Sequence, residues 1–362
     1  MSTGPDDESP AATGMGDQGM RAGNKIGRRH MLATGLGLGA SIGLGAVGRA
    51  APPPEARVGY FVETKPTMIT KSLGWFADSM KTKIVWREMG SGAEINTGIA
   101  AGGLDFGLAI GSSPVAAGIA QGLRYELIGM VDNIGPAEEM TVRTAAHITK
   151  SSDFIGKKIG TPFGSTSHFR LMGFLALNHL SQSQVTVLDM SGEQIVAAWK
   201  RGDIDAAYVW SPAKAEILAD GGSVYETYKE LDAAGYVIAD LIVVSTAFAK
   251  RYPDAVTGFL SAYGKALDLY VSDPDKAAAI VGKEAGVSAA VAKANLAEYD
   301  FVSLKDQLGV EWLGPPGHPG TFAEVLHRTA EFLVQQKSIR SAPQLASFGK
   351  AINTTYLAKA VG

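Results

Sequence analysis

Two hydrophobic periods alternate along most of this 362-residue chain. Short runs of β-branched and aromatic residues, typical of buried strands, are followed by longer segments in which apolar residues recur every three or four positions, as on the core-facing side of a helix. The strands expected from the short runs are 56–62, 83–87, 104–110, 125–131, 158–163, 204–210 and 240–244. Strands that alternate with helices of this length predict an α/β fold, with mixed, mostly parallel sheets covered by helices on both faces.

One pattern occurs twice, about a hundred residues apart. In both copies a turn is followed by an acidic residue, a strand, Ser-Pro and a helix that ends at glycine, first over 104–122 and again over 204–222. We interpret the copies as equivalent units of two similar lobes. After residue 252 the pattern is almost entirely helical, and we assign no chemistry there. The predicted boundaries are 56–139 for the first part of lobe 1, 140–239 for lobe 2, and 240–362 for the return to lobe 1 and its C-terminal helices.

The first 50 residues differ from the rest. Residues 1–27 are rich in Gly, Asp and Ser without periodicity, as in disordered segments. Arg28-Arg29 then precedes a Gly-diluted apolar run that ends in Gly48-Arg49-Ala50, a pattern typical of a twin-arginine export signal. A transmembrane anchor is the alternative, but a run of about 18 residues diluted by glycine is a poor membrane span. The sequence therefore predicts an exported protein that starts near Ala51 and works in the periplasm.

Composition excludes several classes of function. A formal net charge of −3 gives no indication of nucleic-acid binding. The absence of cysteine excludes disulfides, thiolate nucleophiles and cysteine-ligated metals, and the six histidines do not cluster at metal-ligand spacing. No esterase, zinc-protease or phosphate-loop motif occurs. Ser165 or Ser167 with His168 is a weak nucleophile pair, since neighbours at a helix start rarely place a base correctly. We therefore predict no catalytic residues, metal or cofactor.

The segment 157–180 contains the clearest candidate for a binding site. A strand is followed by a turn with three hydroxyl residues, Ser165, Thr166 and Ser167, and by an apolar helix from about His168. Hydroxyl caps and free N–H groups at a helix start bind anions, although ordinary helix capping is the alternative. Ser112 and Ser113 stand at a second such helix start. Because ligands of α/β sheets lie beyond the carboxyl ends of the strands, a small oxyanion held between two lobes is the natural occupant.

A zwitterionic ligand would also need a carboxylate for its cation. The candidates are Asp240 at a strand start, Glu138 in a predicted crossover, and Glu63 after the first strand. Trp210 ends a strand at the same edge, where it could pack on an alkyl chain or stack against an ammonium group, or belong to the core. If the acids face solvent, a plain oxyanion such as nitrate is favoured instead. A betaine-like quaternary ammonium, held by aromatic rings, is a third possibility.

Four motifs carry a resemblance to a known family. They are the Ser-Ser-Pro helix start at 111–114, IGKKI at 155–159, PFGSTSHF at 162–169, and AAWKRGDIDAAYVWSP at 197–212. From about residue 57 onward the chain resembles the periplasmic substrate-binding proteins of the taurine/alkanesulfonate/nitrate class of ABC importers, most closely the taurine-binding branch. The resemblance implies a two-lobed type II fold with two crossovers. Such a monomer closes on its ligand and docks on a membrane permease and its ATPase.

The resemblance also implies roles for single residues. The favoured ligand is taurine. Its sulfonate would lie against Ser112, Ser113 and the turn at 165–167, with Trp210 beside it, and Asp240 would bind its amine. Leu241-Ile242 replaces the bulkier aromatic residue of taurine binders, which leaves another alkanesulfonate as the alternative. Desulfinase-like and pyrimidine-synthase-like enzymes of this fold depend on cysteine or clustered histidines, which this chain lacks. The candidate ligand-binding residues are Ser112, Ser113, Ser165, Thr166, Ser167, His168, Trp210, Asp240, Glu138 and Glu63.

Overall fold

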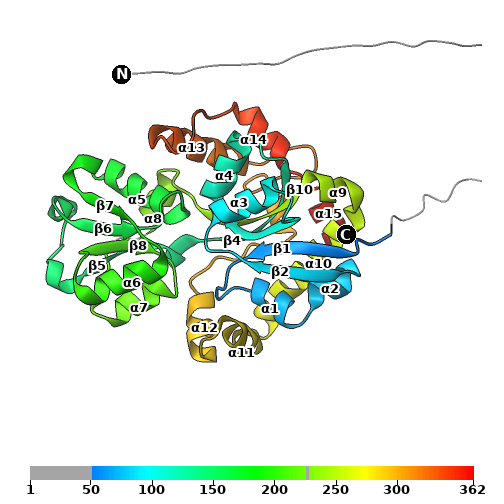
Figure 1. The fold of residues 1–362 in the computed structure, drawn as a ribbon, viewed down its shortest axis with the longest axis horizontal. Coiled ribbons are helices and arrows are strands. Elements are labelled where there is room, and N and C mark those ends of the chain that lie inside the picture. Colours follow the sequence, from blue (N-terminus) through cyan, green and yellow to red (C-terminus); the bar gives the residue numbers. More distant parts are fainter. Residues whose placement is uncertain (1–50, 226–227) are drawn as a thin grey trace, which may run out of the picture. The chain divides into compact units, whose positions relative to one another are not determined.

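The computed structural model describes residues 51–225 and 228–362, and the predicted export signal lies outside the described residues. The chain divides into two units, Met1–Gly48 and Arg49–Gly362, and all of the described residues belong to the second unit. This unit contains two five-stranded sheets, each with its own helices, which form the two lobes of Figure 1. Within the described part of the chain, no helix is both long and apolar enough to cross a membrane.

The first lobe is built on a sheet with the strand order β2-β1-β3-β10-β4. Strand β1 runs parallel to β2 and β3, whereas β10 runs antiparallel to both β3 and β4. The start of β10 therefore lies at the same edge as the carboxyl ends of β3 and β4. The bounds are β1 Glu55–Tyr60, β2 Lys83–Glu88, β3 Phe106–Gly111, β4 Tyr125–Asn133 and β10 Ala239–Ser245, with helices α1 Thr67–Ser72, α2 Trp75–Met80, α3 Gly92–Ala100 and α4 Ser112–Ala120.

The second lobe repeats this plan with the order β7-β6-β8-β5-β9. Strand β6 is parallel to β7 and β8, and β5 is antiparallel to β8 and β9. The strands of the twice-written sequence pattern, β3 and β8, thus hold equivalent middle places. The bounds are β5 Glu139–Arg143, β6 Lys158–Thr161, β7 Thr186–Asp189, β8 Ala206–Val209 and β9 Gly222–Val224, with helices α5 Thr166–Leu177, α6 Gly192–Arg201, α7 Ala213–Ala219 and α8 Tyr228–Ala233.

The chain passes between the lobes twice, first just before β5 and again just before β10, where it returns to the first lobe. Of the helices beyond β10, α10 packs on α2 and α15, and α13 packs on α4. The two-lobed α/β fold expected from the sequence is therefore confirmed. The bounds of this C-terminal part are α9 Thr246–Arg251, α10 Pro253–Ser272, α11 Pro274–Ala285, α12 Ala289–Leu296, α13 Phe322–Gln335, α14 Leu345–Ala351 and α15 Thr355–Val361.

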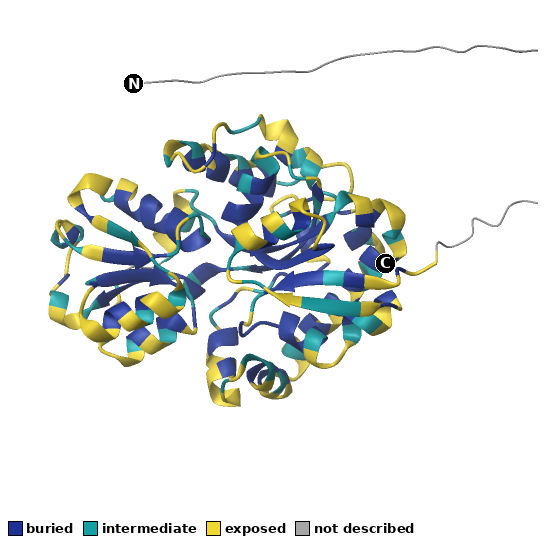
Figure 2. Ribbon diagram, in the orientation of Figure 1, coloured by how far each residue is buried: buried dark blue, intermediate teal, exposed yellow. Residues whose placement is uncertain are grey.

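The buried residues follow the strands and the inner faces of the helices, which are dark in Figure 2. In the first lobe three rings form a stack in which Phe259 of α10 lies between Phe76 and Phe106, with centroid distances of 3.9 and 4.3 Å. A stacked aromatic pair contributes about 0.5–1.5 kcal/mol beyond the area that it buries. The stack therefore fixes α10 on one face of the sheet and keeps the strand ends in place.

Backbone geometry sets several helix boundaries. Gly74 adopts a left-handed φ of +70° and separates α1 from α2. Helix α4 begins at Ser112, two residues before Pro114. Proline is tolerated there because the N–H groups of the first helical turn have no intrahelical acceptor. Near the C-terminus the helical pattern is interrupted between α14 and α15.

Helix α5 also begins earlier than expected, at Thr166 instead of about His168. Ser165 takes an extended conformation at the N-cap, and its side chain accepts a hydrogen bond from the His168 N–H group. Thr166 and Ser167 consequently belong to the first helical turn. Their backbone N–H groups are among those that no helical carbonyl can reach.

Candidate functional site

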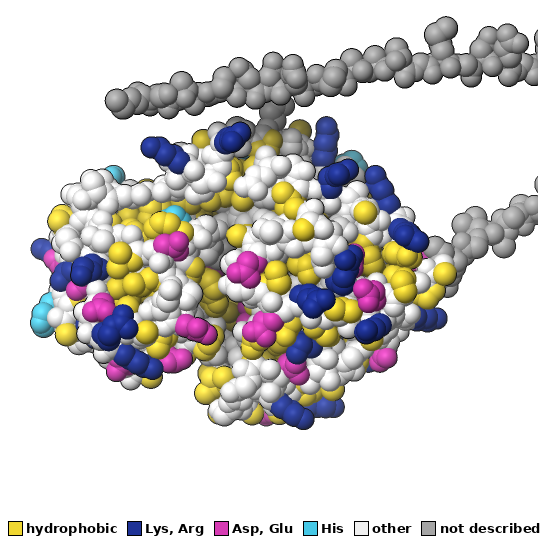
Figure 3. All heavy atoms as spheres, in the orientation of Figure 1, with side chains coloured by type: hydrophobic (Ala, Val, Ile, Leu, Met, Phe, Trp, Pro, Cys, Tyr) yellow, Lys and Arg dark blue, Asp and Glu magenta, His cyan; other side chains and the backbone are white. Residues whose placement is uncertain are grey.

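The two helix starts singled out by the sequence face each other across the lobes. Helix α4 follows β3 of the first lobe, and α5 follows β6 of the second. A Cβ atom added to Gly111 would lie 3.0 Å from Cγ2 of Thr166, so these helix starts are in contact. We call the region between them the interlobe cleft. On the face drawn in Figure 3 the surface is hollowed between the lobes, and acidic side chains lie on both sides of the hollow.

The start of α4 contains two buried hydroxyl groups, of which one is hydrogen-bonded and the other is not. Ser112 Oγ accepts a hydrogen bond of 3.5 Å from the Ala239 N–H group, which ties the helix to β10. Ser113 Oγ is fully buried and has no hydrogen-bond partner. A buried hydroxyl without a partner is unfavourable by about 1–3 kcal/mol. Ser113 therefore has hydrogen-bonding capacity that a ligand could use.

The start of α5 holds a carboxylate from the chain itself. Thr166 Oγ1 and Ser167 Oγ each donate a hydrogen bond of 2.8 Å to Glu138, one to each carboxylate oxygen. Glu138 lies in the first connection between the lobes and is buried. Burial and the nearby carboxylate of Asp240 raise the pKa of Glu138 to about 7, although the two hydroxyl groups and Arg170 oppose this shift. A carboxyl group of the chain itself thus already occupies the predicted oxyanion position.

Asp240 is paired with a residue that the sequence did not single out. In the antiparallel ladder of β10 and β4, Asp240 stands opposite Asp132, an arrangement that is unfavourable for two ionised carboxylates unless a cation lies beside them. Lys65, from the turn after β1, supplies it. Its Nζ forms a short ion pair with Asp240 and lies 3.1 Å from Asp132 Oδ2 and 3.4 Å from Glu63 Oε2. The same Nζ lies 4.4 Å from the ring centroid of Tyr299.

These five residues, Glu63, Lys65, Asp132, Asp240 and Tyr299, form what we call the Lys65 cluster. Lys65 is only 1% exposed. Burial alone would lower the pKa of Lys65. The three carboxylates raise it by more than burial lowers it, so the pKa of Lys65 lies well above its ordinary value. Burial likewise raises the pKa of Glu63 to about 7 and that of Asp132 well above its usual range. With three carboxyl groups for one ammonium group, the cluster retains protons near neutral pH.

Three other predicted residues have mainly structural contacts. Ser165 caps α5, and its hydroxyl group donates to the Pro162 carbonyl at 2.6 Å. His168 Nδ1 accepts from the Gly164 N–H group, its ring stacks on Phe163, and burial lowers its pKa to about 4, so the imidazole is neutral. Trp210 is half-buried and packs against the core of the second lobe at the end of β8. The next residue, Ser211, is buried, and its hydroxyl group has no partner.

None of Lys65, Asp132 and Tyr299 was predicted from the sequence. Lys65 follows the first predicted strand, and a lysine between a strand and a helix at the ligand edge was a usable signal. Asp132 lay one residue beyond the predicted end of its strand, which extends to Asn133. Tyr299 follows α12, far along the chain, and nothing local indicates its contact with Lys65.

Two buried cations hold the connections between the lobes. Arg170 of α5 is fully buried. It donates to the carbonyl groups of Gly135 and Tyr236 and pairs with Asp232, and so contacts the first connection and the segment around the second. Lys214 of α7 donates to the Pro136 carbonyl at 2.6 Å and pairs with Glu139, and its Nζ lies 3.5 Å from Glu298.

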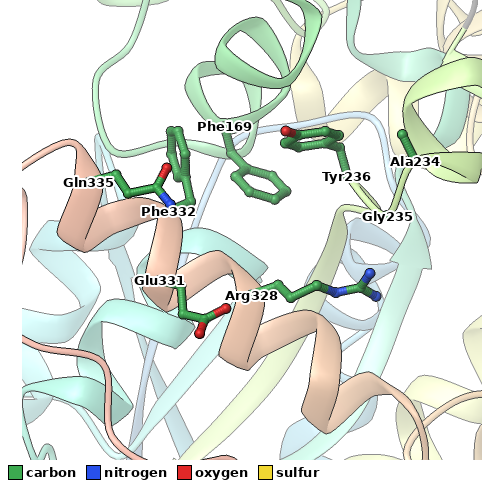
Figure 4. A pocket seen from close by; sticks show the side chains of 8 residues that line it. All are labelled: Phe169, Ala234, Gly235, Tyr236, Arg328, Glu331, Phe332 and Gln335. Atoms are coloured by element: carbon green, nitrogen blue, oxygen red, sulfur yellow. The ribbon is translucent and has the colours of Figure 1, made fainter. Parts of the chain in front are cut away.

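A cavity of about 190 Å³ lies between α13 and the second lobe, as Figure 4 shows. Its lining includes Phe169 of α5, Tyr236 of the second connection, and Arg328 and Phe332 of α13. None of the ten candidate residues lines it. Within residues 51–225 and 228–362, no group of three or more His, Asp and Glu side chains is arranged to hold a metal ion.

Comparison with known proteins places this geometry in context. A family model described as NMT1/THI5 like matches residues 63–277. The taurine-binding periplasmic protein of Escherichia coli (strain K12) is 33% identical over 218 residues, which cover 60% of this chain and 67% of that protein. A putative aliphatic sulfonates-binding protein of Bacillus subtilis (strain 168) is 30% identical over 240 residues, covering 65% and 70%.

The fold is shared with solved structures. The alkanesulfonate-binding protein SsuA from Xanthomonas axonopodis pv. citri, bound to MOPS, superposes with a TM-score of 0.69 at 22% sequence identity. The superposition covers 84% of this chain and 99% of that protein. At this level of identity the likeness establishes the two-lobed architecture.

Proposed function

This chain belongs to the NMT1/THI5-like family, and we propose that it is the periplasmic solute-binding component of an ABC importer that captures a small sulfonate. The observation that carries the proposal is the contact between the start of α4 in one lobe and the start of α5 in the other. Two helix N-termini from separate lobes bind an anion best when the lobes are closed. Closure is then the signal that a membrane permease and its ATPase would recognise.

The relatives support the class of ligand. Their names specify taurine in one case and aliphatic sulfonates in the other. In the proposed complex, the sulfonate oxygens accept hydrogen bonds from the first-turn N–H groups of Thr166 and Ser167 and from Ser113 Oγ. Trp210 provides an apolar surface beside them. Taurine, the ligand favoured by the sequence, and a plain alkanesulfonate are the two candidates. Asp240 distinguishes between them, because the carboxylate expected to bind the amine of taurine already pairs with Lys65.

A direct binding measurement tests the proposal. Isothermal titration of residues 51–362 with ethanesulfonate, taurine, sulfate, nitrate and glycine betaine should show saturable binding of at least one sulfonate at micromolar concentration or below. Because a ligand that binds only the folded state raises its melting temperature, a thermal-shift screen provides an independent measure. Binding of nitrate or betaine without any sulfonate would contradict the proposal.

Lobe closure has its own test at Gly111. We expect Gly111→Ala to weaken sulfonate binding about tenfold, because the new methyl group would press on Cγ2 of Thr166 and hold the lobes apart, at about 1–3 kcal/mol for such overpacking. The φ of −57° at Gly111 suits alanine, so the backbone remains unstrained. Thr166→Ser removes Cγ2 but keeps the hydroxyl group, and the double variant should recover the affinity. Equal losses in the single and double variants would exclude closure at this contact.

A further inference from the structure

The surroundings of Lys65 are those that a ligand's ammonium group would require. Three carboxylates and the face of an aromatic ring converge on its Nζ, which is almost completely shielded from water. Carboxylates from different elements, together with an aromatic face, are the usual recognition groups for an organic ammonium. Here a side chain of the protein occupies that position.

We propose, on the basis of the sulfonate-binding function above, that Lys65 is a specificity-determining residue. Its ammonium group occupies the ammonium subsite of the interlobe cleft, and the protein therefore selects sulfonates that lack an amine. Lys65 is positioned for this role because Asp240 and Asp132 stand opposite each other at the cleft edge of the first sheet. A ligand ammonium that approached Asp240 would have to displace Lys65 or lie beside a like charge.

The sulfonate subsite is separate from Lys65. The Lys65 cluster comes from the first lobe, whereas the first turn of α5 belongs to the second. Lys65 forms its ion pairs with Glu63, Asp132 and Asp240, so its charge is already balanced by acids. It consequently acts on the ligand's cation and not as a counter-ion for the sulfonate. Glu63 Oε1 and Asp132 Oδ1 are buried without a hydrogen-bond partner, and they are the oxygens that a ligand ammonium would seek if this assignment were wrong.

The wild-type protein provides the first test, which requires no variant to fold. Taurine and ethanesulfonate have the same two-carbon chain and sulfonate, and differ by the ammonium group alone. We expect ethanesulfonate to bind at least tenfold more tightly in isothermal titration. Equal affinity, or tighter binding of taurine, would overturn the assignment, because a second ammonium would then be accepted beside Lys65.

The second test replaces Lys65. Lys65→Met keeps much of the side-chain volume but vacates the ammonium position, so the ratio of taurine to ethanesulfonate affinity should rise at least tenfold. Lys71→Met is the matched control. Lys71 belongs to α1 and pairs with Glu284, with both side chains about one-fifth exposed. The control should leave the ratio unchanged. An unchanged ratio in Lys65→Met would also overturn the assignment.

A third measurement separates this inference from the proposed function. Lys65→Ala leaves a space bounded by three carboxylates, and ethylammonium chloride should raise its melting temperature in proportion to concentration, beyond its effect on wild type and on Lys71→Ala. Sodium chloride at equal ionic strength is the salt control. This rescue involves no sulfonate. If no sulfonate binds but the rescue occurs, the proposed function fails while the ammonium site stands. If sulfonates bind but ethylammonium does not selectively stabilise Lys65→Ala, the proposed function stands and the ammonium site fails.

Discussion

Replacing Arg170 by methionine should lower the free energy of unfolding by about 3–5 kcal/mol, the usual effect of removing one partner of a buried ion pair. Arg170 is fully buried, and its guanidinium group serves several acceptors at once. These are the Asp232 carboxylate and carbonyl groups of both interlobe connections. Methionine fills part of the volume but leaves these acceptors without donors. Urea unfolding monitored by tryptophan fluorescence would measure the loss.

An exposed pair of the same type provides the control. Arg201 pairs with Asp203, and both side chains are more than half exposed, so Arg201→Met should change stability by no more than about 1 kcal/mol. Arg170→Lys retains the charge but lacks the planar set of donors, and we expect an intermediate loss. If Arg170→Met were no more destabilising than Arg201→Met, Arg170 would not hold the connections together.

The arrangement of the lobes was predictable because it depends on local patterns. Strand-like runs alternate with helical periods, and the repeated Ser-Pro pattern marks β3 and β8, which occupy equivalent places in the two sheets. The hydroxyl groups at 165–167 likewise indicated a helix start at the ligand edge, although Ser165 serves as the cap and α5 begins at Thr166. Chain periodicity and capping chemistry are sufficient for inferences of this kind.

The content of the cleft could not be predicted in the same way, because it depends on contacts between distant segments. Asp240 lies 175 residues from Lys65, and their pairing follows from the antiparallel position of β10 beside β4. No local pattern encodes that position. Glu138 was expected to face a ligand's cation, whereas it accepts hydrogen bonds from Thr166 and Ser167. The sequence thus indicated the chemical groups of the cleft, and the fold determines how they pair.

Because the charged groups of the cleft pair with one another, few of them are left to bind the charges of a ligand. Within the described residues, the ammonium group of Lys65 lies against the acids of the first lobe, and the carboxylate of Glu138 lies at the helix start of the second. Together they resemble the two charged ends of an aminosulfonate. A ligand that binds must compete with these internal groups, and the charge of Glu138, like that of Glu63, depends on pH near neutrality.

Glu138→Gln should stabilise the protein relative to wild type at pH 8 but have little effect at pH 5. The pKa of Glu138 in the fold is about 7, above its ordinary value of 4.5. A raised pKa favours the folded state below the unfolded-state value, and this contribution is lost as the pH rises through 7. Glutamine carries no titratable proton and can still bond both hydroxyl groups. The advantage of the variant should therefore grow by about 2–3 kcal/mol between pH 5 and pH 8.

Urea unfolding of both proteins at several pH values measures this difference. The titration of Glu63, Asp132 and His168 is common to both and largely cancels in the comparison. Glu216→Gln is the matched control, since that carboxylate is about half exposed and pairs with Lys200 at the surface. Its difference from wild type should stay within about 0.5 kcal/mol across the range. A difference for Glu138→Gln that stayed flat from pH 5 to pH 8 would mean that Glu138 remains ionised throughout. The helix start of α5 would then carry a permanent negative charge, and binding of a sulfonate there would require Glu138 to move away from Thr166 and Ser167.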